Sequence, residues 1–357
     1  MAKRPVMSFS LGNHRVGAGR AFLIAEVAQA HDGSLGFAHA FIGAAARAGV
    51  DAVKFQTHIA AAESTFDEQF RVKFSDQDAT RYDYWKRMEF TEEQWRHLAR
   101  HASDEGLVFL SSAFSVAAVQ LLARVGMPAW KIASGERESG ALLDAMVSAG
   151  GPFIASTGMS TWREIDALVS RLRNANREVA ILQCTSEYPT PLEHVGLNVL
   201  DEMRRRYGVP VGLSDHTGQT APIVAAIARG ADVIEAHITL DRHMFGPDVA
   251  ASLNVQEFRA IVDFRNALAV IDGHPVDKDG MAEKLSAMRD LFGRSLSPVR
   301  ALAAGTIINE DMLDAKKPST GIPERQLSRV VGRRLVRDVS PERLLSWSDI
   351  ESDHDKA

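Results

Sequence analysis

Eight short apolar runs recur between residues 22 and 239, and an amphipathic helical stretch follows almost every one of them. The runs are FLIAEVA (22–28), DAVKFQT (51–57), LVFLSSAF (107–114), AWKIAS (129–134), PFIAST (152–157), VAILQC (179–184), VPVGLSDH (209–216) and DVIEAHIT (232–239). Such alternation is typical of parallel βα units, whose strands are covered on both faces. A doubly wound open sheet is the alternative. Eight units in roughly 250 residues favour an α/β fold that closes into a (β/α)₈ TIM barrel.

The helical stretches carry their own start signals. Thr91 and Gln94 form a capping box, and Thr161 and Glu164 form a second one. After the second box, apolar residues recur at the spacing that gives a helix one face to cover the barrel: Ile165, Leu168, Val169 and Leu172.

A different pattern begins where the barrel pattern ends, near Gly273. Residues 274–290 form a polar connector, and residues 294–350 have short apolar clusters and turn residues, which predicts a small β-rich module. Two segments of the module, GTIINEDML (305–313) and ERLLSWSDI (342–350), form a quasi-repeat. We therefore predict a barrel domain over 1–283, a small domain over 284–352 and a disordered tail at 353–357.

The composition argues against several classes of protein. A net charge of -5 gives no basic surface for nucleic acid, and no run of about 18 apolar residues predicts a membrane span. The N-terminal segment lacks the apolar stretch of a signal peptide, so we expect a soluble cytoplasmic protein. Cys184 is the single cysteine, so an intrachain disulfide and a thiolate metal cluster are excluded.

Polar residues follow nearly every predicted strand at its C-terminal side, where barrel active sites are built. Glu26, Lys54 and Lys131 interrupt three of the apolar runs and would converge on one cavity. A structural ion pair between Glu26 and a neighbouring lysine is the alternative. Two ammonium groups in one cavity need anionic compensation, which a phosphorylated carboxylate would supply.

Hydroxyl and imidazole groups also gather at the predicted strand ends. Five serines lie there and are able to complete a cradle for an anion, although a lone serine is more often a turn former: Ser112, Ser134, Ser156, Ser186 and Ser214. His216 and His237 end two strands that are neighbours in a closed barrel, so they are able to share one divalent cation. Hydrogen-bonded cleft histidines are the alternative. Cys184 is interpreted as a buried filler because no histidine is evidently placed beside it.

Eight segments carry a more specific signal: IAEVAQAHDGSLG, AGVDAVKFQTH, FLSSAFS, WKIASGE, ASTGMS, QCTSEYPTP, GLSDHT and IEAHITLDRHMFGPD. In this order they resemble the N-acetylneuraminate (sialic acid) synthase family over nearly the whole chain. The segment that follows them is similar to the family's antifreeze-like (SAF) domain. The resemblance implies that phosphoenolpyruvate condenses with N-acetylmannosamine or a related hexose, which releases phosphate and gives a nine-carbon 2-keto-3-deoxy acid.

The resemblance also implies roles for individual residues. Glu26 would act in proton transfer or water activation, and the implied catalytic set is Glu26, Lys54, Lys131 and Glu136. The implied phosphoenolpyruvate ligands are Lys54, Ser112, Lys131, Ser134, Ser156, Ser186 and Ser214. His216 and His237 would bind manganese, with Mg²⁺ or Co²⁺ as alternatives. The residues implied to bind the sugar or order its site are Gln56, Tyr188, Asp248 and Lys317. Family members are dimers in which the small domain of one subunit caps the partner's barrel, so a domain-swapped homodimer is expected.

The chain departs from the family pattern at a few positions. Ala28 and Ala30 stand where relatives often have Gly and Asn, Ser112 where relatives can have Thr, and Ser186 where relatives can have Asn. Lys317 replaces the Arg that reaches the N-acyl group in sialic acid synthases, and the two cations differ in directional hydrogen bonding. The sequence therefore leaves open which acceptor sugar is used, whether it is phosphorylated and in which pathway.

Two other functions compete with this interpretation. A Schiff-base aldolase on the same barrel would use Lys54 or Lys131 as the amine nucleophile. A non-catalytic saccharide-binding protein would use the barrel mouth and the small domain for recognition alone, although simple binding does not require this set of lysines, histidines and Glu26.

Overall fold

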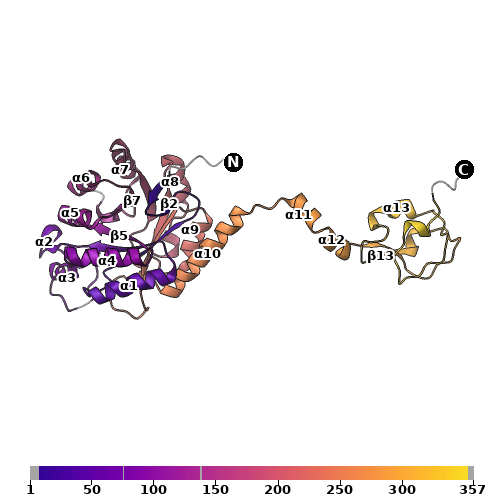
Figure 1. The fold of residues 1–357 in the computed structure, drawn as a ribbon, viewed down its shortest axis with the longest axis horizontal. Helices are drawn as coiled ribbons and strands as arrows, with labels where there is room; N and C mark the ends of the chain where they lie inside the picture. The colour runs from indigo at the N-terminus through magenta and orange to yellow at the C-terminus, as the bar shows by residue number, and fades with distance from the viewer. Residues whose placement is uncertain (1–7, 75, 137–138, 353–357) are drawn as a thin grey trace. The chain divides into compact units, whose positions relative to one another are not determined.

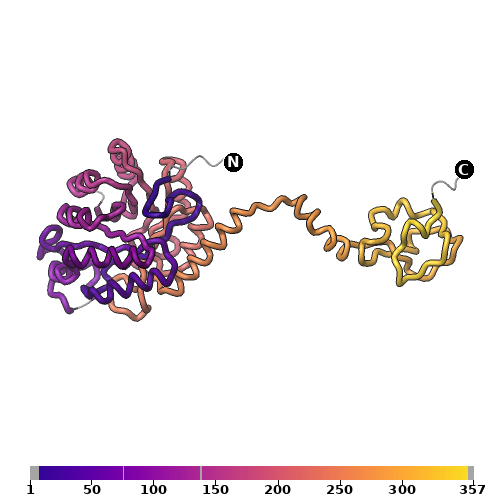
Figure 2. Tube along the Cα trace, in the orientation of Figure 1, coloured from indigo at the N-terminus to yellow at the C-terminus, as the bar shows by residue number. Residues whose placement is uncertain are grey.

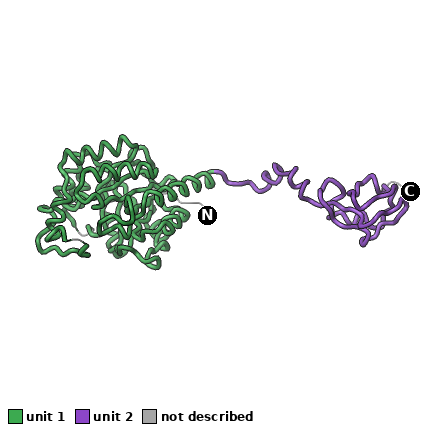
Figure 3. Tube along the Cα trace, turned by 90° about the horizontal axis from the view of Figure 1, so that it is seen from below, with its two compact units in different colours: residues 1–273 green, residues 274–357 purple. Residues whose placement is uncertain are grey.

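The structure is a computed structural model that describes residues 8–74, 76–136 and 139–352. The tail at 353–357, predicted to be disordered, lies outside the described residues. The chain divides after Gly273 into two compact units, residues 1–273 and 274–357 (Figure 3). The boundary expected from the sequence, between 283 and 284, falls inside a short helix of the second unit, α11 (Lys278–Lys284).

Eight parallel strands form the barrel of the first unit. They are β3 (Phe22–Ala28), β4 (Ala52–Thr57), β5 (Val108–Ala113), β6 (Trp130–Ile132), β7 (Phe153–Ser156), β8 (Val179–Cys184), β9 (Val211–Asp215) and β10 (Val233–Ile238). Each strand lies inside one of the eight apolar runs. The predicted strands are therefore confirmed.

The sheet closes on itself, which excludes the open alternative. Val233 of β10 lies opposite Gly212 of β9 and also opposite Phe22 of β3. Gly212 is needed at this closure because a Cβ there would lie 1.9 Å from the carbonyl oxygen of Val233. A short strand, β11 (Ser252–Leu253), pairs with the end of β10.

Helices surround the barrel (Figures 1 and 2). Those of the first unit are α1 (Leu35–Ala48), α2 (Ala60–Glu63), α3 (Arg81–Met88), α4 (Glu92–Asp104), α5 (Val116–Val125), α6 (Gly140–Ala149), α7 (Trp162–Asn174), α8 (Val199–Tyr207), α9 (Thr220–Ala228) and α10 (Val255–Gly273). Both predicted capping boxes are present, at the starts of α4 and α7. The predicted face of α7 is also confirmed, because Ile165, Val169 and Leu172 are buried. Each such side chain contributes about 1.5–3 kcal/mol when fully buried.

An N-terminal hairpin covers the other end of the barrel. Strands β1 (Phe9–Leu11) and β2 (His14–Val16) pair in antiparallel fashion. Phe9, Leu11 and Val16 pack with Phe22 and Val233, the first residues of two barrel strands. The pattern of apolar runs does not predict this hairpin. It leaves the C-terminal ends of the strands as the open end of the barrel.

The second unit is a small β-rich module, as predicted. It contains α11, α12 (Ser286–Phe292), the antiparallel strands β12 (Ser295–Pro298) and β13 (Leu313–Lys316), and α13 (Leu327–Val330). Its core consists of Leu296, Leu302, Ile308, Ile322, Val330, Leu335, Leu345 and Ile350. The quasi-repeat is structural, since Ile308 and Leu345 are both buried and each precedes a single 3₁₀ turn.

Among the described residues, no helix is both long enough and apolar enough to cross a membrane.

Candidate active site

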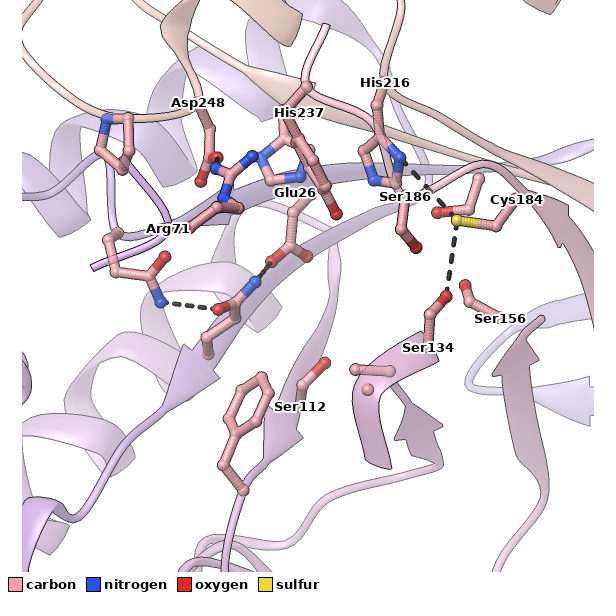
Figure 4. A pocket seen from close by; sticks show the side chains of 18 of the residues that line it. Glu26, Arg71, Ser112, Ser134, Ser156, Cys184, Ser186, His216, His237 and Asp248 are labelled. Carbon is pink, nitrogen blue, oxygen red and sulfur yellow. Dashed lines mark hydrogen bonds and ion pairs between the residues drawn. The ribbon is translucent and has the colours of Figure 1, made fainter. Parts of the chain in front are cut away.

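A cavity of about 330 Å³ lies at the C-terminal ends of the barrel strands (Figure 4). Most of the predicted site residues line it: Glu26, Lys54, Gln56, Ser112, Lys131, Ser134, Ser156, Ser186, Tyr188, Ser214, His216, His237 and Asp248. Glu136 does not, and Lys317 belongs to the second unit. The fold therefore brings together, from all eight strands or the loops after them, side chains that lie more than 200 residues apart in the sequence.

Four buried charged side chains form a cluster in the cavity, which we call the charged cluster: Glu26, Lys54, Lys131 and Glu235. Lys54 makes an ion pair with Glu26, and its Nζ lies 3.6 Å from Oε2 of Glu235. Nζ of Lys131 lies 3.4 Å from Oε1 of Glu235. None of the four residues is more than 5% exposed.

The charged cluster corrects one sequence-based expectation. The two lysines were expected to depend on a substrate anion for compensation, yet Glu235, together with Glu26 while it is ionised, balances their two charges. Glu235 shares a strand face with His237 but was assigned no role, and nothing in its position along the strand shows that it meets both lysines. Removal of one partner from such a buried pair costs about 3–5 kcal/mol.

The two carboxylates of the charged cluster have opposite pKa shifts. Burial raises the pKa of Glu26 to about 7, against the attraction of Lys54. Burial also acts on Glu235, but Lys131 and Lys54 outweigh it and lower the pKa of Glu235 to about 2. Glu235 therefore stays ionised at neutral pH, while Glu26 changes its charge there. Such a separation of two carboxyl groups is typical of acid–base sites.

Serine hydroxyls contact the charged cluster at the predicted strand ends. Lys54 donates to Oγ of Ser112 at 3.2 Å, and Lys131 donates to Oγ of Ser156 at 2.8 Å. The hydroxyl of Ser214 donates to Oε1 of Glu235 at 3.2 Å. Each lysine is thus paired with a hydroxyl, which is the donor set that a phosphate or carboxylate oxygen needs.

A second group of polar atoms lies around Gly158. Its N–H donates to Oγ of Ser134 at 3.0 Å. The hydroxyl of Ser186 is buried and has no hydrogen-bond partner among the described residues, which marks a position for a ligand atom. A Cβ at Gly158 would lie 2.4 Å from Oγ of Ser186 and 2.9 Å from Sγ of Cys184, so these side chains would have to move.

His216 and His237 meet at the cavity wall, with their ring centroids 5.4 Å apart. Nδ1 of His216 lies 3.0 Å from the carbonyl oxygen of Thr185, so it donates there and leaves Nε2 free. Burial lowers the pKa of His237 well below its usual value, which keeps this imidazole neutral. A neutral imidazole with a free nitrogen is the form that binds a metal ion.

Among the described residues, no group of three or more His, Cys, Asp or Glu side chains is arranged to hold a metal ion. A divalent ion bound by His216 and His237 would therefore take its other ligands from water or substrate. Open coordination positions are what a Lewis-acid site needs, so the two imidazoles fit such an ion.

Cys184 is buried, as expected, but the expectation that no histidine lies beside it was wrong. Its Sγ lies 3.8 Å from Nδ1 of His216 and 3.5 Å from Oγ of Ser134. Burial acts to raise the pKa of Cys184, yet the contact with His216 outweighs it and lowers that pKa. Sequence separation hid the contact, since the two residues end neighbouring strands, β8 and β9.

Arg71 is a site residue that the sequence did not reveal. Its guanidinium donates to Oδ1 of Asp248 at 2.9 Å and lies 4.3 Å from the ring centroid of Tyr188. Figure 4 shows Arg71 beside Asp248 and His237. The two predicted sugar-binding residues, Tyr188 and Asp248, are thus joined by an arginine from the loop between α2 and α3.

Glu136 and Lys317 are the two remaining predicted site residues. Glu136 ends a 3₁₀ turn (Ser134–Glu136) that follows β6, and burial, with a contribution from Glu63, raises its pKa to about 7. Lys317 belongs to the second unit, where its Nζ lies 5.1 Å from the ring centroid of Phe292.

Ala28, where relatives often have Gly, has a backbone φ of 48°. The register between β3 and β4 shifts between Glu26 and Ala28, so this residue forms an irregularity at the end of β3. Left-handed backbone costs a non-glycine residue roughly 1–2 kcal/mol, which explains a preference for Gly at this position.

The chain matches the NeuB family over residues 41–276 and the SAF domain over residues 293–351. It belongs to the NeuB family. The resemblance inferred from the motifs and the fold of a TIM barrel followed by a SAF domain are therefore confirmed.

Two relatives named as sugar-acid synthases align with almost the whole of this NeuB-family chain. It is 31% identical to the N,N'-diacetyllegionaminic acid synthase of Legionella pneumophila, over 93% of this chain and 95% of the relative. It is 30% identical to the N-acetylneuraminate-9-phosphate synthase of Homo sapiens, over 90% of each chain. The crystal structure of N-acetylneuraminic acid (sialic acid) synthetase from Leptospira borgpetersenii, in complex with citrate, aligns with a TM-score of 0.69 at 26% identity. That alignment covers 80% of this chain and 98% of the other.

Proposed function

We propose that this NeuB-family chain condenses phosphoenolpyruvate with N-acetylmannosamine or a related amino sugar to give a nine-carbon 2-keto-3-deoxy acid and phosphate. The observation that carries the proposal is the charged cluster, in which two buried lysines, each paired with a serine hydroxyl, share a cavity with a carboxylate of raised pKa. The relatives described above are synthases of sugar acids of this kind.

The donor end of the proposed site is the charged cluster with its serines. Lys54 and Lys131 contact Ser112 and Ser156, and their ammonium groups would exchange part of their contacts within the charged cluster for the phosphate and carboxylate oxygens of phosphoenolpyruvate. Ser134, Ser186 and the backbone around Gly158 would complete the cradle. The unpartnered hydroxyl of Ser186 supports this assignment, since it has a hydrogen bond to give.

The acceptor end is the wall formed by His216, His237, Tyr188 and Asp248. A divalent ion held by the two imidazoles would polarise the aldehyde of the open-chain sugar. Asp248 accepts hydrogen bonds from sugar hydroxyls, and Arg71 keeps its carboxylate in place. With donor and acceptor fixed side by side, proximity is worth up to about 7–11 kcal/mol.

Glu26 is the group proposed to transfer protons during the condensation. C3 of phosphoenolpyruvate bonds to the aldehyde carbon, and water then adds at C2, where positive charge develops. Ionised Glu26 accepts one proton from that water, which replaces the proton taken up by the aldehyde oxygen, and the C–O bond at C2 breaks as the second water proton leaves with the phosphate. A carboxyl group whose pKa lies near 7 suits proton transfer at neutral pH.

The second unit is proposed to complete the site of a partner subunit in a domain-swapped homodimer. Its core of eight buried apolar residues is small, and Leu285, Leu291 and Phe292 on α11 and α12 are exposed. Small modules of this size gain stability when they dock on another chain. Lys317 would then reach the acyl group of the sugar in the partner's cavity.

Phosphate release with a panel of mannosamine-type sugars tests the proposal. We expect phosphate and a keto acid in equal amounts, only when phosphoenolpyruvate and a sugar are both present. The Schiff-base alternative predicts that borohydride traps a covalent adduct at Lys54 or Lys131. Such an adduct, or sugar binding without any turnover, would overturn the proposal.

A further inference from the structure

A chain of hydrogen bonds runs from Glu26 through Gln56, an expected sugar-site residue, to α2, and the side chains beyond Gln56 have no role in the proposed reaction. Nε2 of Gln56 donates to Oε1 of Glu26 at 3.1 Å. Nε2 of Gln29 donates to Oε1 of Gln56 at 2.6 Å and lies 2.8 Å from Nε2 of His58. Nδ1 of His58 then contacts the carboxylate of Glu63. We call this series the hydrogen-bond chain.

The imidazole in the middle of the hydrogen-bond chain is held on both faces. His58 is 4% exposed and stacks between Trp85 and Phe114, with ring centroids 3.8 Å and 4.4 Å away and interplanar angles of 14° and 12°. The ring plane is therefore fixed. One nitrogen faces Glu63 and the other faces Gln29, so only the position of the protons remains to be decided.

Donor and acceptor roles along the chain follow from its two ends. While Glu26 is ionised it only accepts, so Gln56 must offer N–H to it and turn its oxygen toward Gln29. Gln29 then gives one N–H to that oxygen and the other to Nε2 of His58. Nε2 also lies 3.3 Å from Oε1 of Gln56, to which it would donate if it were protonated, but the shorter contact of 2.8 Å with the NH₂ group of Gln29 makes Nε2 an acceptor. The proton of His58 therefore sits on Nδ1, facing Glu63.

We propose that Gln29, His58 and Glu63 are positioning residues that fix the amide of Gln56 so that it donates to Glu26. The carboxylate of Glu26 then has a partner at each oxygen: Gln56 donates a hydrogen bond to Oε1, and Lys54 makes an ion pair with Oε2. The inference rests on the proposed role of Glu26 as the group that accepts a proton. Without Glu63, His58 is free to carry its proton on Nε2, which turns Gln29 and in turn Gln56.

Nitrogen-15 NMR of histidine-labelled protein tests the proton position without any need for activity. At pH 8.5, where Glu26 is ionised, we expect the signal that disappears in His58→Asn to be that of a neutral ring protonated at Nδ1. Glu63→Met, which removes the acceptor, should convert a substantial fraction to the Nε2–H form, whereas Glu63→Gln keeps an oxygen and should largely preserve Nδ1–H. A wild-type ring protonated at Nε2 would overturn the proposal.

Steady-state kinetics tests the effect on Glu26. Glu63→Met should lower kcat about tenfold, with at most a twofold change in KM for phosphoenolpyruvate, and Glu63→Gln should recover most of the loss. In a Gln56→Met background, Glu63→Met should lower kcat less than twofold further, because its effect passes through Gln56. A tenfold loss in both backgrounds would show that Glu63 acts through stability alone.

Glu89→Gln is the matched control. Glu89 also meets α2, where its Oε1 accepts the N–H of Ala60 at 2.9 Å, but it has no link to the hydrogen-bond chain. Its kcat and its His58 signal should match the wild type. If the wild type has no phosphoenolpyruvate-dependent activity, the proposed function fails while the NMR experiment still decides the proton position.

Discussion

Glu26 and His237 occupy paired positions on the neighbouring strands β3 and β10. Side chains at paired positions of parallel strands point to the same side of the sheet, so the carboxylate and the imidazole enter the barrel mouth at one level. The predicted proton-transfer group therefore lies beside a predicted metal ligand. The groups proposed for bond formation at the aldehyde and for proton removal from water therefore lie side by side, and each step can be tested.

Metal dependence is the first prediction. Chelation should abolish activity and manganese should restore it, because the two imidazoles at the cavity wall form an open site for a divalent ion. His216→Ala and His237→Ala should each lower kcat by about a hundredfold or more and weaken manganese binding, measured by calorimetry. His97→Ala, on the exposed side of α4, is the control. Full activity of both variants in chelator would rule out the metal role.

The second prediction concerns which bond of phosphoenolpyruvate breaks. If water adds at C2, the C–O bond of phosphoenolpyruvate breaks and the bridging oxygen leaves with phosphate. Substrate labelled with ¹⁸O at the bridge should therefore give labelled phosphate, detected by mass spectrometry. Hydrolysis at phosphorus would leave the label in the keto acid, and that result is incompatible with the proposed step.

Much of the barrel was predictable because the decisive signals are local. The capping box at Thr161 and the apolar spacing from Ile165 to Leu172 lie within one helix, and each strand lies within one apolar run. The polar residues at strand ends were also predictable, since the barrel places every strand end at the same rim.

Contacts between distant segments were not predictable in the same way. Arg71 and Asp248 are 177 residues apart, and their ion pair depends on the path of the loop before α3. Glu235 was visible on its strand, but its contact with both lysines depends on barrel closure and on side-chain direction. The thiol of Cys184 likewise meets His216 because β8 and β9 are neighbours. The pattern of residues along the sequence does not indicate any of these contacts.

The pKa of Glu26 sets the expected pH dependence. Burial raises it to about 7, so the group is protonated below that pH and ionised above it. If ionised Glu26 accepts the proton, kcat/KM should rise with pH through about 7. The pKa of Glu136 is also about 7, so Glu136→Gln must be compared with Glu26→Asp. The rise should move in Glu26→Asp and stay in Glu136→Gln; the opposite pattern would assign the proton transfer to Glu136.

Substitution of Gly158 tests the proposed phosphoenolpyruvate site without removal of any polar group. A Cβ at this position would lie 2.4 Å from Oγ of Ser186 and 2.9 Å from Oγ of Ser134, so both hydroxyls must move. Gly158→Ala should raise KM for phosphoenolpyruvate by about tenfold or more, which corresponds to about 1.4 kcal/mol. Gly140→Ala is the control, because a Cβ there meets no atom within 4 Å. An unchanged KM in Gly158→Ala would place the donor elsewhere in the cavity.

The last prediction is that Lys317 acts on the cavity of a partner subunit. Lys317 lies in the second unit, whereas every predicted phosphoenolpyruvate ligand lies in the barrel, so Lys317→Ala should raise KM for the sugar about tenfold and leave KM for phosphoenolpyruvate unchanged. The exposed Lys278→Ala on α11 is the control for loss of a positive charge. Glu26→Gln and Lys317→Ala, mixed and allowed to exchange subunits, should regain up to about a quarter of the wild-type activity, because only a mixed dimer contains one site with both residues intact. No recovery after exchange verified by mass spectrometry would show that Lys317 acts within its own chain or outside the site, and an unchanged KM for the sugar would remove it from recognition altogether.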